Sequence, residues 1–448
     1  MHNPAVDQVD EIIGQIQNIE DFTLHGFVER LEGLSAVVRI NSQKVHIGTR
    51  CWLYPLNHPP VLGEVINFNQ DLAQVMTFQP LQGLHPKCKV TFLEYGTTIY
   101  PSLHWQGRVI NGLGEPIDGK DKLIYGAVPY NLHGSPLSAH NRAKVKDRIE
   151  LGVRAIDTFL TCCKGQRLGI FAGSGVGKSI LLSMLVKFSN CDICVVGLIG
   201  ERGREVREFI EDTLGEEGLK RTIVVVATSD ETALMRRQAA FLTLRLAEFY
   251  RDLGLSVVCV IDSVTRFAMS QREIGLAAHE PPTTKGYTPS VFAELPKLLE
   301  RAGPGIENTN GKTGYITGFF TVLVDGDDHN EPISDAVRSI LDGHIVLDRS
   351  LATRGHYPAI NILQSISRTV PMCHSDSEQL AVNEARKNLS VYNDMVDLIR
   401  LGAYRVGTDA SVDQAIQLQS KLEQFLQQKP TEFVHQVDSF DELKSIMG

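Results

Sequence analysis

The sequence predicts an α/β protein whose mostly parallel sheet is preceded by a small N-terminal β-barrel and followed by a helical domain. Three observations support this prediction. Continuous apolar runs alternate with helical stretches between residues 150 and 370, as in a parallel sheet covered on both faces. Short β-rich stretches separated by turn residues occupy 22–92, a pattern typical of a small barrel or sandwich. Residues 373–448 are polar, have helical periodicity and contain no strand candidate.

The composition excludes several classes of protein. The 448 residues are 43% hydrophobic and 22% charged, which is close to the average for globular proteins and argues against wholesale disorder. No apolar run approaches the ~18 residues that cross a bilayer. The first Lys or Arg is Arg30, so neither a signal peptide nor a transit peptide fits. A net charge of −9 argues against a general nucleic-acid binder. We therefore expect a cytoplasmic protein without a nucleic-acid partner.

We expect four segments along the chain. Residues 1–21 form an N-terminal helical segment, which either packs on the surface or docks a partner. Residues 22–92 form the β-barrel domain, and 93–372 form the α/β domain, beginning with a turn-rich connector over 93–150. Residues 373–448 form the C-terminal helical domain. The strand candidates of the α/β domain are the apolar runs 167–171, 193–199, 222–228, 256–262, 316–324 and 359–363.

The eight cysteines are scattered along the chain, as expected for reduced thiols in a cytosol. Cys191 and Cys194 form a C-x-x-C at the start of an apolar run that is interpreted as a strand. Residues three apart in a strand point to opposite faces, and no second pair supplies further metal ligands. We therefore expect two core thiols and no shared metal site.

A glycine-rich loop follows the first apolar run of the α/β domain. The run AGSGVGKS (172–179) joins that strand to an amphipathic helix. This is the Walker A layout, in which glycines let backbone N–H groups close around phosphate oxygens and the helix N-terminus adds positive potential. Lys178 would reach the β- and γ-phosphates of ATP, and the Ser179 hydroxyl would bind Mg²⁺. Ala172 replaces the first Gly of the strict pattern, and a small residue there keeps the turn possible. The expected nucleotide-binding residues are Gly173, Ser174, Gly175, Val176, Gly177, Lys178 and Ser179.

Two carboxylates are expected beside this loop. Asp262 ends an apolar run and is a Walker B candidate that holds Mg²⁺. Glu201 follows another run, at the carboxyl edge where ligands bind in open α/β sheets. With Lys178 and Asp262 on neighbouring strand ends, Glu201 would orient the water that attacks the γ-phosphate. A helix-capping glutamate in a charged, exposed segment is the alternative, and it describes Glu205 and Glu208 better than Glu201.

These motifs together resemble the α/β-subunit family of rotary ATPases. The resemblance rests on AGSGVGKS (172–179), GERGRE (200–205), VIDS (260–263), GRVINGLGEPIDG (107–119) and PAINILQSIS (358–367). Within the family, the chain is similar to the type III secretion branch, which includes the flagellar export ATPase and the injectisome ATPase. That similarity rests on residues 286–303, 325–349 and 352–361, and DGDDHNEP and SISRTVP make the flagellar member the closer match.

The resemblance implies a RecA-like P-loop ATPase that hydrolyses ATP with Mg²⁺ and forms a homo-hexamer with nucleotide sites between protomers. It implies that Glu201 is the catalytic carboxylate and that Arg202 lies near the γ-phosphate. Tyr357 matches the adenine-stacking aromatic, with a surface tyrosine beside a turn as the alternative. Arg368 matches an arginine finger from the adjacent subunit, with an Arg–carboxylate pair inside one protomer as the alternative.

The implied function is to energise type III protein export for flagellar assembly, with injectisome secretion as the alternative. A non-catalytic subunit would lack Glu201, an RNA translocase would need a basic, aromatic channel, and the secretion-type segments disfavour a proton-driven synthase subunit. The implied partners are a stator-like regulatory protein at the N-terminus, a coiled-coil central stalk protein facing residues 271–288, export-gate membrane proteins and substrate–chaperone complexes. The implied location is cytoplasmic, peripherally associated with the inner-membrane export apparatus.

Overall fold

A computed structural model of the chain describes residues 24–40, 44–93, 97–138, 140–145, 147–307, 311–324 and 331–448. The chain divides into two compact units. The first runs to Thr98 and includes Leu276–Glu280, and the second comprises Ile99–Gly275 and Pro281–Gly448. The helix expected over 1–21 lies outside the described residues. None of the described helices combines the length and the apolar character needed to cross a membrane.

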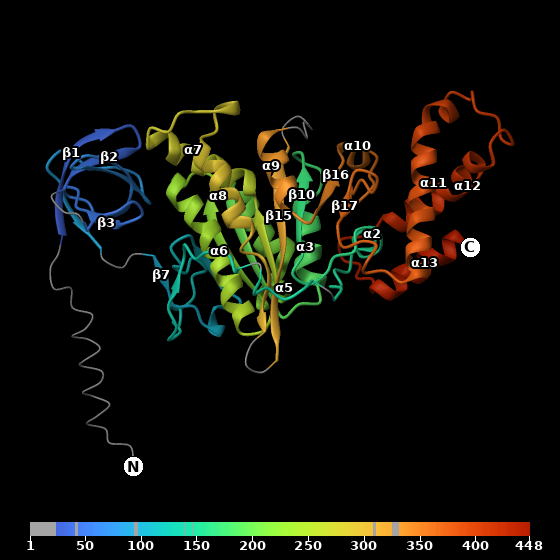
Figure 1. Cartoon of the computed structure of the whole chain (residues 1–448), viewed down its shortest axis with the longest axis horizontal. Coiled ribbons are helices and arrows are strands. Elements are labelled where there is room, and N and C mark those ends of the chain that lie inside the picture. Colours follow the sequence, from blue (N-terminus) through green and yellow to red (C-terminus); the bar gives the residue numbers. More distant parts are fainter. Residues whose placement is uncertain are drawn as a thin grey trace, which may run out of the picture. The chain divides into compact units, whose positions relative to one another are not determined.

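The first unit contains a closed barrel of antiparallel strands in the order β1-β2-β5-β4-β3-β6, which confirms the predicted barrel (Figure 1). Its strands are β1 (Leu24–Glu32), β2 (Ser35–Arg39), β3 (Arg50–Leu53), β4 (Val61–Asn69), β5 (Leu72–Thr77) and β6 (Lys89–Phe92). Val38, Val65 and Val75 are fully buried in its core. Closure pairs every strand on both sides, so the barrel exposes no edge strand to another chain.

The second unit is built on a mostly parallel sheet in the order β17-β16-β10-β15-β13-β11-β12-β8, with β14 paired to β15. The antiparallel exceptions are β14 with β15 and β16 with β17. The strands are β8 (Val109–Asn111), β10 (Arg167–Ala172), β11 (Ile193–Glu201), β12 (Thr222–Thr228), β13 (Ser256–Asp262), β14 (Gly303–Glu307), β15 (Thr313–Leu323), β16 (Gly343–Leu347) and β17 (Ile366–Ser367). The connector adds the two-residue strands β7 (Thr98–Ile99) and β9 (Tyr130–Asn131) and the 3₁₀ turn η1 (Leu103–Trp105).

The helices of the second unit lie mainly between these strands. Those of the α/β part are α2 (Arg154–Phe159), α3 (Lys178–Phe188), α4 (Gly203–Glu208), α5 (Gly215–Lys220), α6 (Ala233–Asp252), α7 (Val264–Ala277), α8 (Pro289–Leu299), α9 (Pro332–Ile340) and α10 (Arg349–Thr353), with the π-helical turn η2 (Phe209–Leu214) and the 3₁₀ turn η3 (Thr284–Gly286). The segment 271–288, which the resemblance places opposite the stalk protein, is helical as far as Ala277, where α7 ends.

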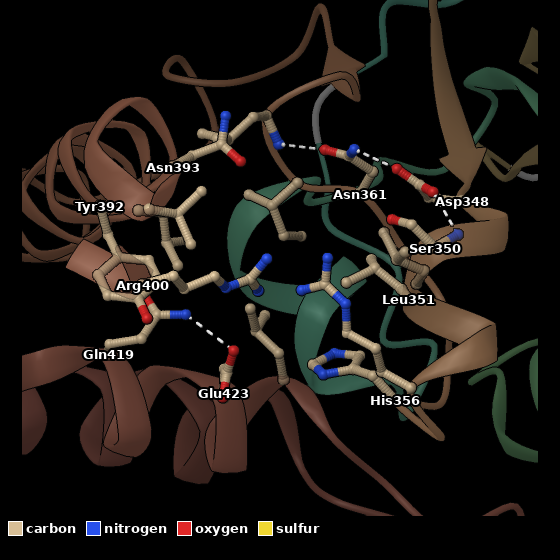
Figure 2. A pocket seen from close by; sticks show the side chains of 17 residues that line it. Asp348, Ser350, Leu351, His356, Asn361, Tyr392, Asn393, Arg400, Gln419 and Glu423 are labelled. Carbon is tan, nitrogen blue, oxygen red and sulfur yellow. Dashed lines mark hydrogen bonds between the residues drawn. The ribbon is translucent and has the colours of Figure 1, made fainter. Parts of the chain in front are cut away.

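One predicted strand is wrong. Residues 359–363 make only an isolated bridge at Ile360, and the apolar run Gly343–Leu347 instead forms β16 beside β10. The reason is the side chain of Asn361 (Figure 2). Its Oδ1 accepts hydrogen bonds from the backbone N–H groups of Leu363 and Gln364, both at 3.1 Å. Such an Asx turn bends the chain and satisfies backbone donors that a sheet ladder would otherwise use.

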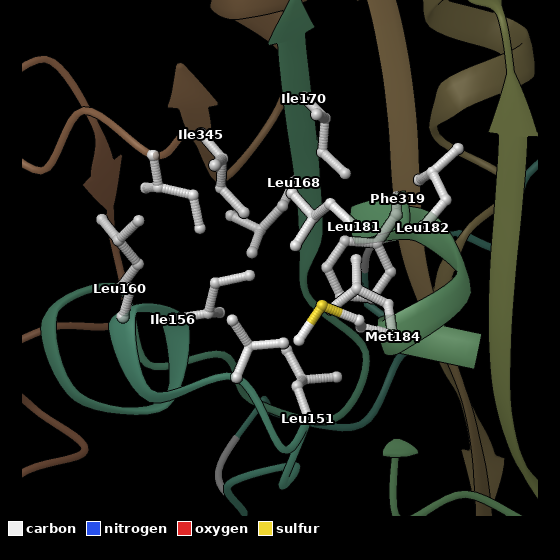
Figure 3. Close-up of a cluster of buried hydrophobic side chains, with 14 of the residues drawn as sticks. Leu151, Ile156, Leu160, Leu168, Ile170, Leu181, Leu182, Met184, Phe319 and Ile345 are labelled. Atoms are coloured by element: carbon white, nitrogen blue, oxygen red, sulfur yellow. The ribbon is translucent and has the colours of Figure 1, made fainter. Parts of the chain in front are cut away.

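The main core holds α3 against the sheet. Leu181, Leu182 and Met184 of α3 pack with Ile170 of β10 and Phe319 of β15, and all five are at most 1% exposed (Figure 3). Fully burying a leucine side chain stabilises a fold by ~1.5–3 kcal/mol. Because its buried face is fixed in this way, α3 presents its first residues at one edge of the sheet.

The C-terminal region is helical, as predicted, with α11 (Asp376–Arg400), α12 (Ala410–Leu426) and α13 (Gln436–Met447). A capping box begins α11, in which Ser375 and Glu378 bond each other's backbone N–H groups. Glu378 also pairs with Arg148, whose Nη1 and Nη2 lie 3.1 and 2.5 Å from its two oxygens. Phe440 and Leu443 of α13 belong to the same buried cluster as α3. The helical region therefore packs on the α/β core.

Candidate active site

The loop between β10 and α3 has the conformation that phosphate binding needs. Gly175 and Gly177 have φ angles of +76° and +90°, in the left-handed region that favours glycine. Gly177 is the N-cap of α3, so Lys178 and Ser179 form its first turn. Ala172 lies within β10, paired with β15 and β16, and no special backbone angle requires glycine there. The departure from the strict motif therefore costs the loop nothing.

Lys178 reaches both predicted carboxylates. Its Nζ lies 2.5 Å from Asp262 Oδ1 and 3.3 Å from Glu201 Oε1. The three side chains are 12%, 5% and 14% exposed, so the cluster is largely shielded from water. The hydroxyl of Thr321 donates a further hydrogen bond to Asp262 Oδ1 at 2.7 Å. The structure thus brings the predicted lysine and both acids together.

Burial and charge set the protonation of this cluster. Burial alone would lower the pKa of Lys178, but the carboxylates of Asp262 and Glu201 outweigh it and raise that pKa. Burial raises the pKa of Glu201, the charge of Asp262 adds to the effect, and Lys178 opposes it. Lys178 therefore stays cationic, and Glu201 is a stronger base than a free glutamate. Since Brønsted behaviour favours a base poised near the working pH, this shift suits a general base.

The donor set fits Mg²⁺ as the metal of an ATP complex. The Ser179 hydroxyl is exposed at the first turn of α3, and Asp262 supplies a carboxylate, both oxygen donors of the kind that Mg²⁺ prefers. Two carboxylates face one ammonium, which leaves an excess of negative charge for a cation. Among the described residues, no group of three or more His, Cys, Asp or Glu side chains forms a complete metal cage. Mg²⁺ is usually held by one or two protein ligands together with phosphate oxygens and water.

Strand order explains how these residues meet. We expected Lys178 and Asp262 on neighbouring strand ends, but β15 lies between β10 and β13 and places Thr321 between them. Glu201 ends β11 after a register shift, where Gly200 has a φ of +70°. A bulge of this kind re-aims the side chain that follows it. All four side chains therefore lie at the carboxyl edge of the sheet.

Two residues of this region were missed by the sequence analysis. Thr321 is one polar residue in an apolar strand, and only the register shows that it faces Asp262. Arg266 packs its stem against Gly200, where an added Cβ would lie 2.9 Å from Arg266 Cβ. Its Nε is buried without a hydrogen-bond partner within the described part of the chain. The sequence feature that could have identified Arg266 is a positively charged residue four positions after Asp262, at the start of a helix.

Two other predicted site residues, Tyr357 and Arg202, lie at separate positions. The ring of Tyr357 faces the phosphate loop, 3.3 Å from the position of an added Cβ on Gly177, and is 40% exposed. Arg202 is the N-cap of α4, with an 80% exposed side chain that pairs with Glu205 at 3.4 Å. A cavity of about 200 Å³ between α10, α11 and α12, lined by both polar and apolar side chains, contains none of the predicted site residues (Figure 2).

Arg368 lies at the opposite edge of the sheet. Ser367 pairs with Gly343 at the start of β16, and Arg368 N donates to Asp342 O at 3.0 Å. In a parallel sheet the starts of the strands lie at the edge away from their carboxyl ends, so Arg368 does not face the Lys178 of its own chain. The side chain is exposed, and its guanidinium forms no hydrogen bond or ion pair with any residue described. The intramolecular Arg–carboxylate pair is therefore absent from the described part of the structure.

Comparisons with known proteins identify the family of the chain. Residues 152–367 match the model of the ATP synthase alpha/beta family, nucleotide-binding domain, and 374–445 match the T3SS EscN ATPase C-terminal domain. The chain is 54% identical to the flagellum-specific ATP synthase of Caulobacter vibrioides, over 97% of this chain and 98% of that one. Identity to the Bacillus subtilis protein of the same name is 46%, over 98% and 99%.

Solved structures of the type III secretion ATPase EscN also resemble the chain. The assembled ATPase EscN of the enteropathogenic E. coli type III secretion system matches with a TM-score of 0.88 and 38% identity, covering 94% of this chain and all of that one. EscN in complex with its central stalk EscO matches with a TM-score of 0.85. The fold and site define a P-loop enzyme that hydrolyses ATP. The chain belongs to the ATP synthase alpha/beta family, within its flagellum-specific group. It is a type III export ATPase of the flagellar kind.

Proposed function

We propose that this chain hydrolyses Mg–ATP at the Lys178 cluster and uses the energy to drive protein export during flagellar assembly. The observation that carries the proposal is the double contact of Lys178 Nζ with Asp262 and Glu201 beside a loop shaped for phosphate. Backbone N–H groups of 173–179 hold the phosphates, and Lys178 neutralises charge on the transferred phosphoryl group. Tyr357 stacks on the adenine. Arg202 is proposed near the γ-phosphate by family likeness alone.

Glu201 is the base in this proposal. Its carboxylate accepts a hydrogen bond from the attacking water, orients it towards the γ-phosphate and takes up its proton. Ser179 and Asp262 would hold Mg²⁺, which when bound neutralises charge on the phosphate oxygens. Lys178 then turns from the two carboxylates to the nucleotide, which leaves Glu201 free to bind water.

We further propose a head-to-tail homo-hexamer in which Arg368 of one protomer completes the site of the next. The support is the position of Arg368 at the edge opposite Lys178, without an intramolecular partner among the described residues. Two different surfaces of one chain then meet, and such contacts close into rings when the rotation permits. The likeness to EscN, which has been solved as an assembled ATPase, agrees with this proposal.

The partners are proposed from family membership. A coiled-coil stalk protein would contact the region 271–288 at the ring centre, in keeping with the EscN–EscO complex. A stator-like regulator would bind the N-terminal segment 1–21. Export-gate membrane proteins and substrate–chaperone complexes would complete the set. The enzyme would then work in the cytoplasm, peripherally associated with the inner-membrane export apparatus.

Two variants test the chemistry. Lys178→Ala and Glu201→Gln should each abolish steady-state ATP hydrolysis, and Glu201→Gln should still bind nucleotide because the amide keeps the shape and loses only the base and charge. Glu208→Gln, on an exposed residue of the next helix that pairs with Arg204, is the matched control and should hydrolyse ATP normally. Near-normal turnover by Glu201→Gln would remove that residue from the catalytic role.

Mixing tests the ring. Arg368→Ala and Lys178→Ala chains should each be inactive, and they should regain part of the activity when co-assembled, because some interfaces then pair an intact loop with an intact finger. An arginine supplied in trans is worth ~10³–10⁵ in rate in other phosphoryl-transfer enzymes, so the recovery should be easy to detect. Mixed rings that are verified by mass and yet remain inactive would contradict the trans role.

A further inference from the structure

Two thiols are in contact where α3 ends, at the helix terminus away from the phosphate loop. Cys191 Sγ lies 3.5 Å from Cys194 Sγ. The expectation that these side chains point to opposite faces of a strand is wrong, because β11 begins only at Ile193 and Cys191 lies in the turn before it. The turn folds the first thiol back onto the second.

The surroundings of Cys191 favour a thiolate. Arg221 caps the end of α3, with Nη2 donating to the carbonyls of Val186 and Ser189 at 2.6 and 2.9 Å, and its Nη1 donates to Cys191 O at 3.4 Å. The hydroxyl of Ser189 lies 3.4 Å from Cys191 Sγ. A hydroxyl therefore adjoins the thiol of Cys191, a guanidinium binds the carbonyl of the same residue, and Cys191 is partly exposed. Thiolates form preferentially beside such groups.

The two sulfurs differ in character. The hydrogen bond with Cys194 is the main effect that lowers the pKa of Cys191 to about 7, with help from Ser189 and Arg221 against burial. The same bond and complete burial raise the pKa of Cys194. A partly exposed cysteine with the lower pKa is thus in contact with a buried cysteine of higher pKa, which is the division between an attacking and a resolving cysteine.

The remaining cysteines give a comparison. Cys259 is fully buried in β13, and burial raises the pKa of its thiol to about 12. This thiol is therefore inaccessible to a disulfide reagent and stays protonated. Cys373 has a pKa lowered to about 7 by a hydrogen bond with Cys163, with Arg148 adding to the effect. No metal-binding group of three or more ligands includes Cys191 and Cys194 in the described chain, so a redox role fits the pair better than metal binding.

We propose that Cys191 and Cys194 form a dithiol–disulfide redox site that reacts with a small disulfide such as oxidised glutathione. The thiolate of Cys191 attacks one sulfur of glutathione disulfide, forms a mixed disulfide and releases one glutathione thiolate. The Cys194 sulfur, losing its proton, then attacks Sγ of Cys191, closes the intramolecular disulfide and releases the second glutathione. The two cysteines lose two electrons, glutathione disulfide gains them, and the two protons end on the two glutathione thiols.

The change of position is small. A disulfide needs a sulfur–sulfur distance of ~2.05 Å, so the two sulfurs at 3.5 Å have only to approach by about 1.5 Å within one short turn. The site lies at the opposite end of α3 from Lys178 and Ser179, so its formation does not depend on ATP hydrolysis. The test of this redox site therefore measures the oxidation of two thiols, and its outcome does not depend on the proposed function.

Trypsin places both cysteines in one peptide. Cleavage after Lys187 and Arg202 releases residues 188–202, which contain Cys191, Cys194 and no other cysteine. The full chain is equilibrated in glutathione buffers of rising oxidised fraction, alkylated, digested and weighed. We expect this peptide to become two hydrogens lighter and resistant to alkylation as the oxidised fraction rises, and to recover when reduced glutathione is restored.

Variants separate the two steps. Cys194→Ser should trap glutathione on Cys191 as a stable mixed disulfide, and Cys191→Ser should leave Cys194 unmodified because it is buried. Cys259→Ser is the matched control and should oxidise as the native chain does; the same holds for Cys373→Ser, which removes the other low-pKa thiol. A native peptide that remains fully alkylated under excess glutathione disulfide would overturn the proposal without any variant. So would a Cys194→Ser chain that carries no adduct.

Discussion

The hydroxyl of Thr321 offers a sharp test of the site geometry. Thr321 is fully buried on β15, between the strands that carry the phosphate loop and Asp262. Its Oγ1 donates to Asp262 Oδ1 at 2.7 Å, and Lys178 Nζ contacts the same oxygen at 2.5 Å. Thr321→Val keeps the shape of the side chain and removes only the donor, so the carboxylate would be held by Lys178 alone.

The size of the effect follows from the kind of hydrogen bond lost. A hydrogen bond to a charged group contributes ~1.5–3 kcal/mol, and each 1.36 kcal/mol is about tenfold in rate. If the loss falls on the transition state, kcat/KM for ATP should fall by roughly 10- to 150-fold. Because Asp262 is proposed to support Mg²⁺, the variant should also need more Mg²⁺ for half-maximal activity.

The assay is steady-state hydrolysis over a series of Mg²⁺ concentrations. Thr321→Ser should restore most of the activity, since it returns the hydroxyl. Thr317→Val is the matched control on the same strand: Thr317 is also fully buried, but its hydroxyl accepts from Gly165 N at 3.1 Å and does not contact Asp262. Normal turnover and Mg²⁺ dependence in Thr321→Val would refute the reasoning, as would an equal loss in Thr317→Val.

Two further predictions follow from single contacts. Glu378→Gln should lower the free energy of unfolding at pH 7 by ~1.5–3 kcal/mol, because it removes the charge that strengthens the hydrogen bonds with Arg148. The hydrogen bond from Arg148 lowers the pKa of Glu378 to about 2, so the stabilisation is complete above the unfolded pKa of ~4.3 and is lost as the pH falls towards 2. The free energies of unfolding of the native chain and of Glu378→Gln, measured in urea, should therefore converge over that pH range. A difference that stays constant with pH would contradict the ion pair. Tyr357→Ala should weaken ATP binding by roughly 5- to 150-fold if its ring stacks on the base, whereas Tyr357→Phe should bind normally in a fluorescent-nucleotide titration; equal affinities would leave Tyr357 a surface residue beside Gly177.

Local motifs could be predicted because their chemistry requires adjacent residues. The phosphate loop needs glycines directly before Lys178, and Asp262 must end its strand, so both are visible in a few consecutive letters. The strand at 359–363 failed for the converse reason. Its apolar letters fit a strand, but the side chain of Asn361 satisfies the next backbone donors and turns the chain. Strand propensity does not report whether a neighbouring side chain accepts hydrogen bonds from the backbone.

Thr321 could not be predicted, since its role depends on strand order. It lies in an apolar run more than 50 residues after Asp262, and a threonine there fits any buried β-strand. Only the insertion of β15 between β10 and β13 brings its hydroxyl to the carboxylate. The contact of Cys191 with Cys194 was missed for a similar reason, because it depends on a strand that begins two residues later than Cys191.

The position of Arg368 bears on whether this residue acts within its own chain or on a neighbouring protomer. The motif alone left two readings, a finger offered to a neighbour or a pair within the protomer. The antiparallel register of β17 on β16 puts Arg368 at the starting edge of the strands, whereas Lys178 and Glu201 occupy the carboxyl edge. A β-strand rises ~3.3 Å per residue, so the five residues of β16 alone separate these edges by more than the reach of an arginine side chain. If Arg368 takes part in hydrolysis, it does so on another protomer, and the active site of this enzyme is complete only in an oligomer.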